Sequence, residues 1–317
     1  MPRAVRFDRY GDLDQLHLAD VRSRPPKTGE VVVRVRAAGV NPGEVAILRG
    51  DMDADFPATF PSGQGTEFAG VIVELGDQVG GVDIGDGVIG FSDTRDAQAD
   101  EVVLPTSNVL LKPEGVDWDV AAIIPISGAT ATSMIRAAQP QPGETVVVSG
   151  AGGGVGFIAA QLLRLAQANV IGIAGEADHD SLRAIGVLPV AYGEGVEGRV
   201  RKIAPNGIDA FLDTNGRGQA DLAVALGVAP DRVDSIIDFE AGQRLGIKTE
   251  GMYQLDDIRA AVIEVAGLVA SGSIEMPVRA RYPLEHVVEA YRALDTVPGV
   301  GRIVLEISAD DAAATRP

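Results

Sequence analysis

The sequence contains no cysteine among its 317 residues. Without a thiol, the chain cannot form a disulfide bond, a thiolate zinc site, an iron–sulfur cluster or a cysteine nucleophile. Only three histidines are present, His17, His179 and His286, and they are scattered along the chain. Three unclustered histidines do not provide the ligands of a catalytic zinc ion. We therefore expect no zinc in the site.

Positive charge is also scarce, because 45 acidic residues oppose 27 lysine and arginine residues. The resulting net charge of −18 repels phosphate backbones and anionic lipids, so nucleic acids and membrane surfaces are not expected partners. The sequence has no uninterrupted apolar run of membrane-spanning length, and its N-terminus has no apolar segment of the kind found in signal peptides. These features predict a cytoplasmic protein.

A change in periodicity divides the chain, which at this length is expected to form two domains. Residues 30–40 alternate apolar and charged side chains, and the short segments 68–76, 85–91 and 97–105 also read as strands of a partly closed barrel. From about residue 120, apolar runs alternate with helical patterns, which predicts a doubly wound parallel sheet. Its last strand is expected at residues 232–239 and its closing helix at 255–272.

The strongest chemical signal is the glycine-rich turn at residues 149–156, which lies between a predicted strand and a predicted helix. A pyrophosphate needs backbone N–H groups at a helix N-terminus with no side chain in the way. Ala151, Gly153 and Gly156 occupy the small-residue positions of the dinucleotide-binding fingerprint, and Gly154 and Val155 complete the turn. No Lys-Ser or Lys-Thr pair follows, which excludes a P-loop.

The residues after the second strand of this domain favour NADPH over NADH. The strand ends in Ala174-Gly175, and small residues there leave room for a 2′-phosphate, whereas NAD sites usually place a carboxylate at this end. His179 and Tyr192 are expected near the phosphate or the adenine, and Arg183 adds positive charge. Glu176 keeps NADH as the alternative.

Six stretches carry a family resemblance: residues 37–50, 65–79, 85–91, 128–156, 208–216 and 301–307. In this order along the chain, they together resemble the medium-chain dehydrogenase/reductase superfamily, in its zinc-independent quinone oxidoreductase branch. The resemblance implies an α/β fold in which a Rossmann doubly wound parallel sheet is inserted into a partly open, β-barrel-like (GroES-like) catalytic domain. It implies residues 1–120 plus 274–317 for the catalytic domain and 121–273 for the nicotinamide dinucleotide-binding domain, with the active site between them and a homodimer formed through Rossmann-domain edges.

The resemblance also implies roles for single residues. Asn41 corresponds to an asparagine that orients the acceptor, and Thr130 to a threonine near the nicotinamide. Thr66 stands where zinc-dependent members have a histidine ligand, and Ala46 where quinone reductases often have a tyrosine. Two nearby residues, Glu44 and Arg49, are expected to be solvated on a helix.

The expected activity is therefore hydride transfer from NADPH to a quinone or another α,β-unsaturated carbonyl compound. Two alternatives stay open at this point: a reductase of the double bond in enones or enoyl thioesters, and a non-catalytic NADPH-binding sensor. No residue in the sequence stands out as the proton donor, and solvent is expected to supply the proton.

Overall fold

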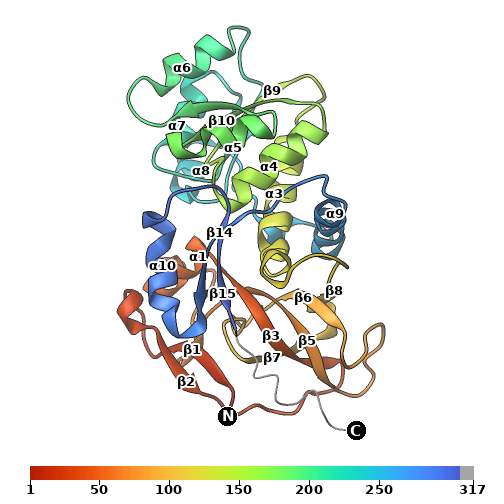
Figure 1. Ribbon diagram of the computed structural model, residues 1–317. Helices are drawn as coiled ribbons and strands as arrows, with labels where there is room; N and C mark the ends of the chain where they lie inside the picture. The colour runs from red at the N-terminus through yellow and green to blue at the C-terminus, as the bar shows by residue number, and fades with distance from the viewer. Residues whose placement is uncertain (308–317) are drawn as a thin grey trace. The chain divides into compact units, whose positions relative to one another are not determined.

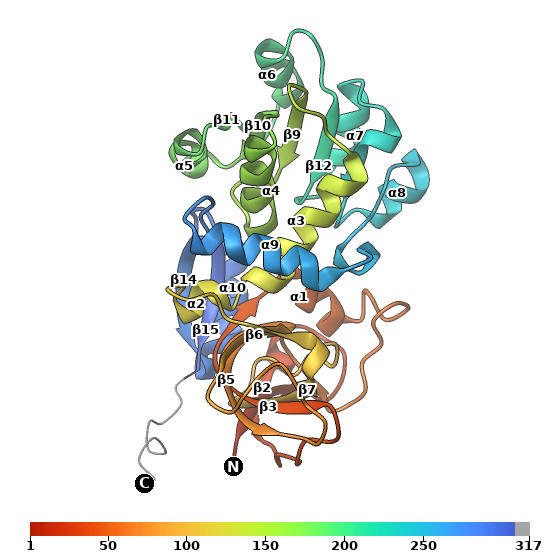
Figure 2. The ribbon, with the colours of Figure 1, turned by 90° about the vertical axis from the view of Figure 1, so that its right-hand side faces the viewer.

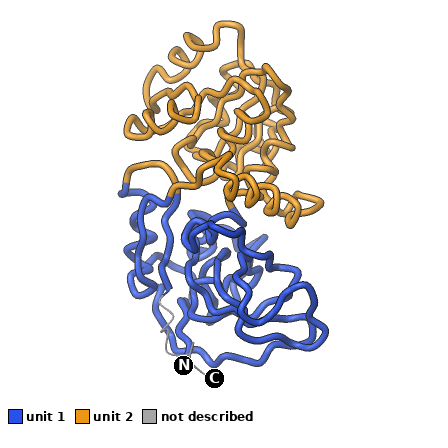
Figure 3. The backbone as a smooth tube through the Cα atoms, turned by 45° about the vertical axis from the view of Figure 1, so that its right-hand side comes forward, with its two compact units in different colours: residues 1–126, 278–297, 302–317 blue, residues 127–277, 298–301 orange. Residues whose placement is uncertain are grey.

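The computed structural model describes residues 1–307, and it divides into two compact units (Figure 3). Of the described residues, unit 1 contains 1–126, 278–297 and 302–307, and unit 2 contains 127–277 and 298–301. The predicted domain limits, after residues 120 and 273, lie six and four residues before the observed boundaries after residues 126 and 277. The short return of residues 298–301 to unit 2 was not anticipated from the sequence.

Unit 1 is built on two sheets (Figure 1). The larger one has the strand order β14-β15-β3-β5-β6-β8, with β7 also pairing with β3, and all its pairs are antiparallel except β14 with β15. The smaller one has the order β2-β1-β4. The strands of the two sheets of unit 1 are β1 Arg3–Phe7, β2 His17–Asp20, β3 Glu30–Val40, β4 Ser62–Gly63, β5 Glu67–Leu75, β6 Gly87–Phe91, β7 Glu101–Pro105, β8 Val109–Leu111, β14 Val278–Pro283 and β15 Arg302–Glu306.

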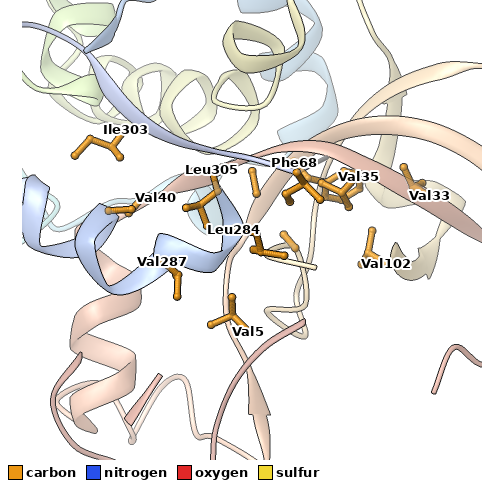
Figure 4. Packing of buried hydrophobic residues seen from close by; sticks show 14 of the residues in the cluster. Val5, Val33, Val35, Val40, Phe68, Val102, Leu284, Val287, Ile303 and Leu305 are labelled. Carbon is orange, nitrogen blue, oxygen red and sulfur yellow. The ribbon is translucent and has the colours of Figure 1, made fainter. Parts of the chain in front are cut away.

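The core of unit 1 lies between the large sheet and helix α10 (Figure 4). Val33 and Val35 of β3 are fully buried and the arginines that alternate with them are not, as the sequence pattern predicts. Val287 and Ala290 of α10 face the same core at helical spacing. The helices of unit 1 are η1 Leu13–Gln15, α1 Pro42–Arg49, η2 Thr106–Asn108, α2 Trp118–Ala121, η6 Leu284–His286 and α10 Val287–Thr296.

Unit 2 contains a five-stranded, all-parallel sheet with the order β11-β10-β9-β12-β13 (Figure 2). The chain starts at β9 in the centre, proceeds to one edge, and then crosses to the other side of β9. The strand order therefore reverses at β9, which is where doubly wound sheets bind their ligands. The strands are β9 Thr145–Ser149, β10 Asn169–Ala174, β11 Leu188–Ala191, β12 Ala210–Asp213 and β13 Val233–Ser235.

Helices connect and cover these strands. Helix α4 packs on β9 and β10, and α7 packs on β12 and β13. The helix that joins the units, α3 Ile124–Ala138, begins in unit 1 and continues into unit 2. The others are α4 Gly154–Leu165, η3 Glu176–Asp178, α5 His179–Ala184, α6 Val196–Ile203, α7 Gln219–Ala225, η4 Pro230–Arg232, α8 Phe239–Leu245, η5 Met252–Gln254 and α9 Ile258–Ala270.

The observed architecture confirms the predicted fold class, a Rossmann sheet inserted into a GroES-like domain. Two predicted strands are shorter than expected. The segment 232–239 forms a strand only over Val233–Ser235, because Asp238 accepts a hydrogen bond from the Ala241 amide and starts helix α8. The segment 97–105 pairs as a strand only from Glu101 onward. No helix within residues 1–307 is long and apolar enough to cross a bilayer.

Candidate active site

The glycine-rich turn follows β9 directly and requires glycine at specific positions. Gly150 adopts a positive φ of 78°, and a side chain there would overlap the Thr214 hydroxyl. A Cβ on Gly156 would overlap the Gly150 carbonyl oxygen. The turn closes through a 2.8 Å hydrogen bond from the Gly153 amide to the same carbonyl. The sequence thus brings the start of α4 close against the end of β9.

Helix α4 begins without a hydrogen bond from an N-cap side chain. Gly153 is the N-cap residue, has an extended backbone and offers no side chain to cap the helix. The next three residues, Gly154, Val155 and Gly156, form the first turn. The amides of a first helical turn have no partner within the helix and carry the positive end of its dipole. This end of α4 is therefore suited to an anion.

Ala151, which replaces the first glycine of the fingerprint, is accommodated inside the fold. Its side chain is fully buried, and its amide donates to the Ile173 carbonyl of β10 at 3.1 Å. Gly172 of β10 makes room for it, because a Cβ on Gly172 would approach the Ala151 methyl group to 2.9 Å. The methyl group therefore packs into the sheet and leaves the turn open.

The segment 298–301 pairs with this turn through Gly301, a contact that no pattern in the sequence predicts. The Gly301 amide donates to the Gly152 carbonyl at 3.0 Å, and Gly301 forms a parallel bridge with Gly153. Gly301 has a φ of 100°, and a Cβ there would overlap the Pro277 carbonyl. Only glycine satisfies both conditions.

Tyr192, at the end of β11, contacts the same turn. Its hydroxyl accepts a hydrogen bond from the Gly150 amide at 2.9 Å, and burial raises its pKa. His179 begins α5 and is half-buried, and Gly175 lies at the end of β10 in extended conformation. All three lie at the carboxyl edge of the sheet, where the sequence predicted contacts with the adenosine end. Those contacts stay predictions.

Asp178 is a further residue at this edge that the sequence reasoning missed. Its carboxylate lies against Gly152, since a Cβ on Gly152 would overlap Asp178 Oδ2, and it lies 3.8 Å from the Cβ position of Gly175. Arg183, the expected source of positive charge, pairs with Asp180 at 2.6 Å. A carboxylate beside the turn opposes a 2′-phosphate and is compatible with a ribose hydroxyl.

In unit 1, Asn41 lies between β3 and α1 and is 8% exposed. Its Nδ2 atom lies 3.2 Å from each of three oxygen acceptors, which belong to Glu44, Thr66 and Glu67. Its Oδ1 atom accepts a 2.7 Å hydrogen bond from Arg302 Nη2. The side chain is therefore held at both ends of its amide.

The expectation that Glu44 is solvated is wrong, since Glu44 is 2% exposed. Its carboxylate accepts a hydrogen bond from the backbone amide of Asn41 at 2.9 Å. It also accepts hydrogen bonds from the backbone amide and the side-chain hydroxyl of Thr66, at 2.8 and 2.7 Å. The Tyr291 hydroxyl donates to it at 2.5 Å. These donors replace water around the charge, so its burial is tolerated. Arg49, in contrast, is exposed as expected and pairs with Asp12.

Glu67 and Arg302 form a buried ion pair beside Asn41. Glu67 Oε1 lies 2.6 Å from Arg302 Nη2, and their side chains are 0% and 8% exposed. Burial raises the pKa of Glu67, and the charge of Arg302 opposes that effect. The other oxygen of Glu67 accepts the Ile126 amide at 2.8 Å. Gly39 allows this approach, because a Cβ there would overlap the Glu67 carboxylate.

Comparison with known families agrees with this architecture. The model of the alcohol dehydrogenase GroES-like domain matches residues 27–139, and that of the zinc-binding dehydrogenases matches residues 190–305. The chain belongs to the medium-chain dehydrogenase/reductase superfamily. The predicted resemblance is confirmed, and the chain is an oxidoreductase of this superfamily.

The chain also has distant relatives among characterised proteins, as their sequence identities show. The synaptic vesicle membrane protein VAT-1 homolog of Danio rerio is 29% identical, over 96% of this chain and 69% of that protein. The VAT-1 homolog-like protein of Mus musculus is 32% identical, over 67% of this chain and 50% of that protein. A quinone oxidoreductase of Pseudomonas syringae pv. Tomato DC3000 superimposes with a TM-score of 0.86 at 24% identity, covering 96% of this chain and all of that one. That similarity concerns the fold.

The residues of this superfamily member do not fit a zinc ion. Asn41 and Thr66 are hydrogen-bonded to each other, and neither amide nor hydroxyl is a usual zinc ligand. Within residues 1–307, no group of three or more His, Cys, Asp or Glu side chains could hold a metal ion. The residues that stand at the zinc position of related dehydrogenases therefore do not form a zinc site here.

Thr130 is the remaining predicted site residue. It lies in α3, within unit 2, and is 7% exposed. Helix α3 packs closely against α9 nearby, since a Cβ on Gly128 would approach Val265 to 2.9 Å. This packing fixes the helix that carries Thr130. Its contact with the nicotinamide end stays a prediction.

Proposed function

We propose that the protein reduces a quinone or another α,β-unsaturated carbonyl compound with hydride from NADPH. The observation that carries the proposal is the start of helix α4, where uncapped amides follow a turn that has no room for side chains at Gly150 and Gly156. A dinucleotide pyrophosphate requires this combination of donors and free space. Membership of the superfamily supports the use of a nicotinamide cofactor.

In this proposal, the amides of Gly154, Val155 and Gly156 bind the pyrophosphate. Ala151 and Gly153 shape the turn without covering it. The nicotinamide ring supplies the hydride when it is bound. The protein contributes orientation and the exclusion of water, and no residue of the chain is assigned as a proton donor, so the proton comes from solvent.

On the acceptor side, we assign Asn41 the role of orienting the acceptor. Arg302 donates to the Asn41 Oδ1 atom and polarises the amide. Because Nδ2 has two hydrogens and already faces Glu44, Thr66 and Glu67, an acceptor that takes a hydrogen bond from it must displace one of these partners. A donor to a developing oxyanion is typically worth about 3 kcal/mol in the barrier. Thr66 is the half-buried neighbour of Asn41 in this network.

NADPH is proposed because small residues end β10 and because His179 and Tyr192 lie at the same edge. The carboxylate of Asp178 beside Gly152 favours NADH instead. A direct test titrates NADPH and NADH separately, following nicotinamide fluorescence, and then screens quinones and enones with the tighter nucleotide. Oxidation of the nucleotide by an acceptor is expected. Binding without turnover would favour the sensor, and absence of binding would end the proposal.

We also propose that the protein is a homodimer, that its acceptor is a small molecule and that it is located in the cytoplasm. The support is the resemblance described above, in which Rossmann-domain edges pair. Light scattering after size-exclusion chromatography should give twice the mass of the 32.9 kDa chain. A mass of one chain at micromolar concentration would contradict the dimer.

A further inference from the structure

The chain passes between the two units four times, after residues 126, 277, 297 and 301 (Figure 3). Two of these four passages begin or end in unit 1 at a residue that contacts the carboxylate of Glu67. It accepts the amide of Ile126, the last residue of unit 1 before unit 2, and it pairs with Arg302, the first residue after the return. Glu67 is fully buried, and both of its carboxylate oxygens have partners.

The first passage runs along helix α3. Ile126 lies in the first turn of this helix, and Glu67 Oε2 accepts its amide at 2.8 Å. A carboxylate in this place also interacts favourably with the positive end of the helix dipole. The same helix continues into unit 2 and carries Thr130. Glu67 therefore contributes to holding the start of α3 in unit 1.

The second passage leads to the glycine-rich turn. Gly301, whose amide donates to the Gly152 carbonyl in unit 2, is joined by a peptide bond to Arg302, whose guanidinium contacts Glu67 Oε1 in unit 1. Backbone and hydrogen bonds thus run without interruption from the turn to Glu67. Arg302 Nη2 and Glu67 Oε1 also contact the two ends of the Asn41 amide. A route of hydrogen bonds and one peptide bond therefore leads from the turn to Asn41.

We propose that Glu67 is a positioning residue that couples nucleotide binding at the glycine-rich turn to the placement of Asn41. The inference rests on the proposed function. It goes further because it assigns a shared control point to two sites, the turn in unit 2 and the acceptor-orienting residue in unit 1. Coupling of this kind requires a connected network with little slack, and the burial of Glu67 and Arg302 supplies it.

Hydrogen–deuterium exchange of the full-length chain, with NADPH or NADH, whichever binds more tightly, tests this coupling. In the unaltered protein, the nucleotide should slow exchange at residues 150–156 and also at residues 37–44 and 302–306. Glu67→Gln keeps the shape and removes the charge that holds Arg302. In this variant, protection should remain at 150–156 and disappear at 37–44. The nucleotide affinity should change by less than about threefold, while the KM for the acceptor should rise about fivefold or more.

Asp96→Asn is the matched control, because Asp96 pairs with Arg6 at 2.7 Å within unit 1 and flanks neither passage. It should transmit protection as the unaltered protein does. If Glu67→Gln does not fold, Arg302→Lys replaces it, since lysine keeps the charge but loses the planar group that reaches both Asn41 and Glu67.

The outcomes separate the two proposals. If the unaltered protein binds neither nucleotide, the proposed function fails, and this inference fails with it. If the nucleotide binds and Glu67→Gln still transmits protection to residues 37–44, the inference alone is overturned. The same holds if the unaltered protein shows protection at the turn and none at residues 37–44.

Discussion

Tyr291 of α10 donates its hydroxyl hydrogen to the carboxylate of Glu44, and each of the two residues is only 2% exposed. They are 247 residues apart in the sequence. Gln64 and Gln98 donate to the same hydroxyl oxygen at 3.0 and 2.9 Å. Burial and the nearby charge of Glu44 raise the pKa of Tyr291 well above its ordinary value. The phenol is therefore a neutral donor that compensates a buried carboxylate.

Removing this hydroxyl should destabilise the protein. Tyr291→Phe leaves one carboxylate oxygen of Glu44 and the amides of Gln64 and Gln98 with fewer partners in a buried place. The expected cost is about 2–3 kcal/mol in the free energy of unfolding, measured by urea denaturation. Tyr282→Phe, at a half-buried position on β14, is the control and should change stability by less than about 0.5 kcal/mol. Equal stability of the two variants would contradict the role given to Tyr291.

A second prediction concerns pH. Asp234 of β13 is fully buried, and burial raises its pKa to about 7. Its Oδ1 atom accepts the Glu250 amide at 2.7 Å, and Oδ2 has no hydrogen-bond partner. Because the folded state binds the proton more tightly than the unfolded state, the contribution of Asp234 to stability is full below pH 4 and is lost as the pH rises to about 7.

Asp234→Asn should therefore stabilise the protein at pH 8 relative to the unaltered chain, by at most about 4 kcal/mol. At pH 4 the two proteins should differ little. Thermal unfolding followed at both pH values measures the difference. Asp231→Asn, at an exposed position nearby, is the control. A difference that is independent of pH would show that the carboxyl group of Asp234 is not the cause.

The sequence predicts the fold well, because the strand periodicity of the first part of the chain and the strand–helix repeats of the second part are local patterns. The alternation in β3 and the strand–helix repeats from β9 onward depend on neighbours a few residues apart, and the structure confirms both. The strand expected at 232–239 ends at Ser235, because Asp238 caps the helix that follows. Apolar residues stand on both sides of Asp238, so the sequence pattern does not reveal that a helix begins there.

The acceptor-side network is different, because its partners are distant in the sequence. Arg302 and Glu67 are separated by 235 residues, so no local pattern indicates that they pair. Glu44 stands two residues after Pro42 in the first turn of a short helix, a place where most carboxylates are solvated. Only the return of β15 to the sheet beside β3 brings these charges together. Such networks require the tertiary structure.

The glycine-rich turn leads to a third prediction. Gly156→Ala places a methyl group onto the Gly150 carbonyl and should disrupt the turn. We expect nucleotide affinity to fall at least about tenfold, a loss of 1.4 kcal/mol or more, measured by nicotinamide fluorescence. Gly267→Ala is the control, since this glycine lies in α9 with nothing within 4 Å of its Cβ position. If Gly156→Ala binds as tightly as the control, the pyrophosphate is not held at this turn.

The last prediction concerns the choice between the two nucleotides. The Asp178 carboxylate lies against Gly152 at the edge where a 2′-phosphate would be bound, and two negative groups there repel each other. Asp178→Asn removes the charge and keeps the size of the side chain, so the ratio of NADPH to NADH affinity should rise by about threefold to tenfold. Asp180→Asn removes the same charge from a side chain that is 99% exposed. Because solvent screens that charge, its effect on the ratio should be smaller. An equal rise in both variants would mean that the general negative charge of the region sets the preference, and an unchanged ratio in Asp178→Asn would place the 2′-position of the ribose away from this carboxylate.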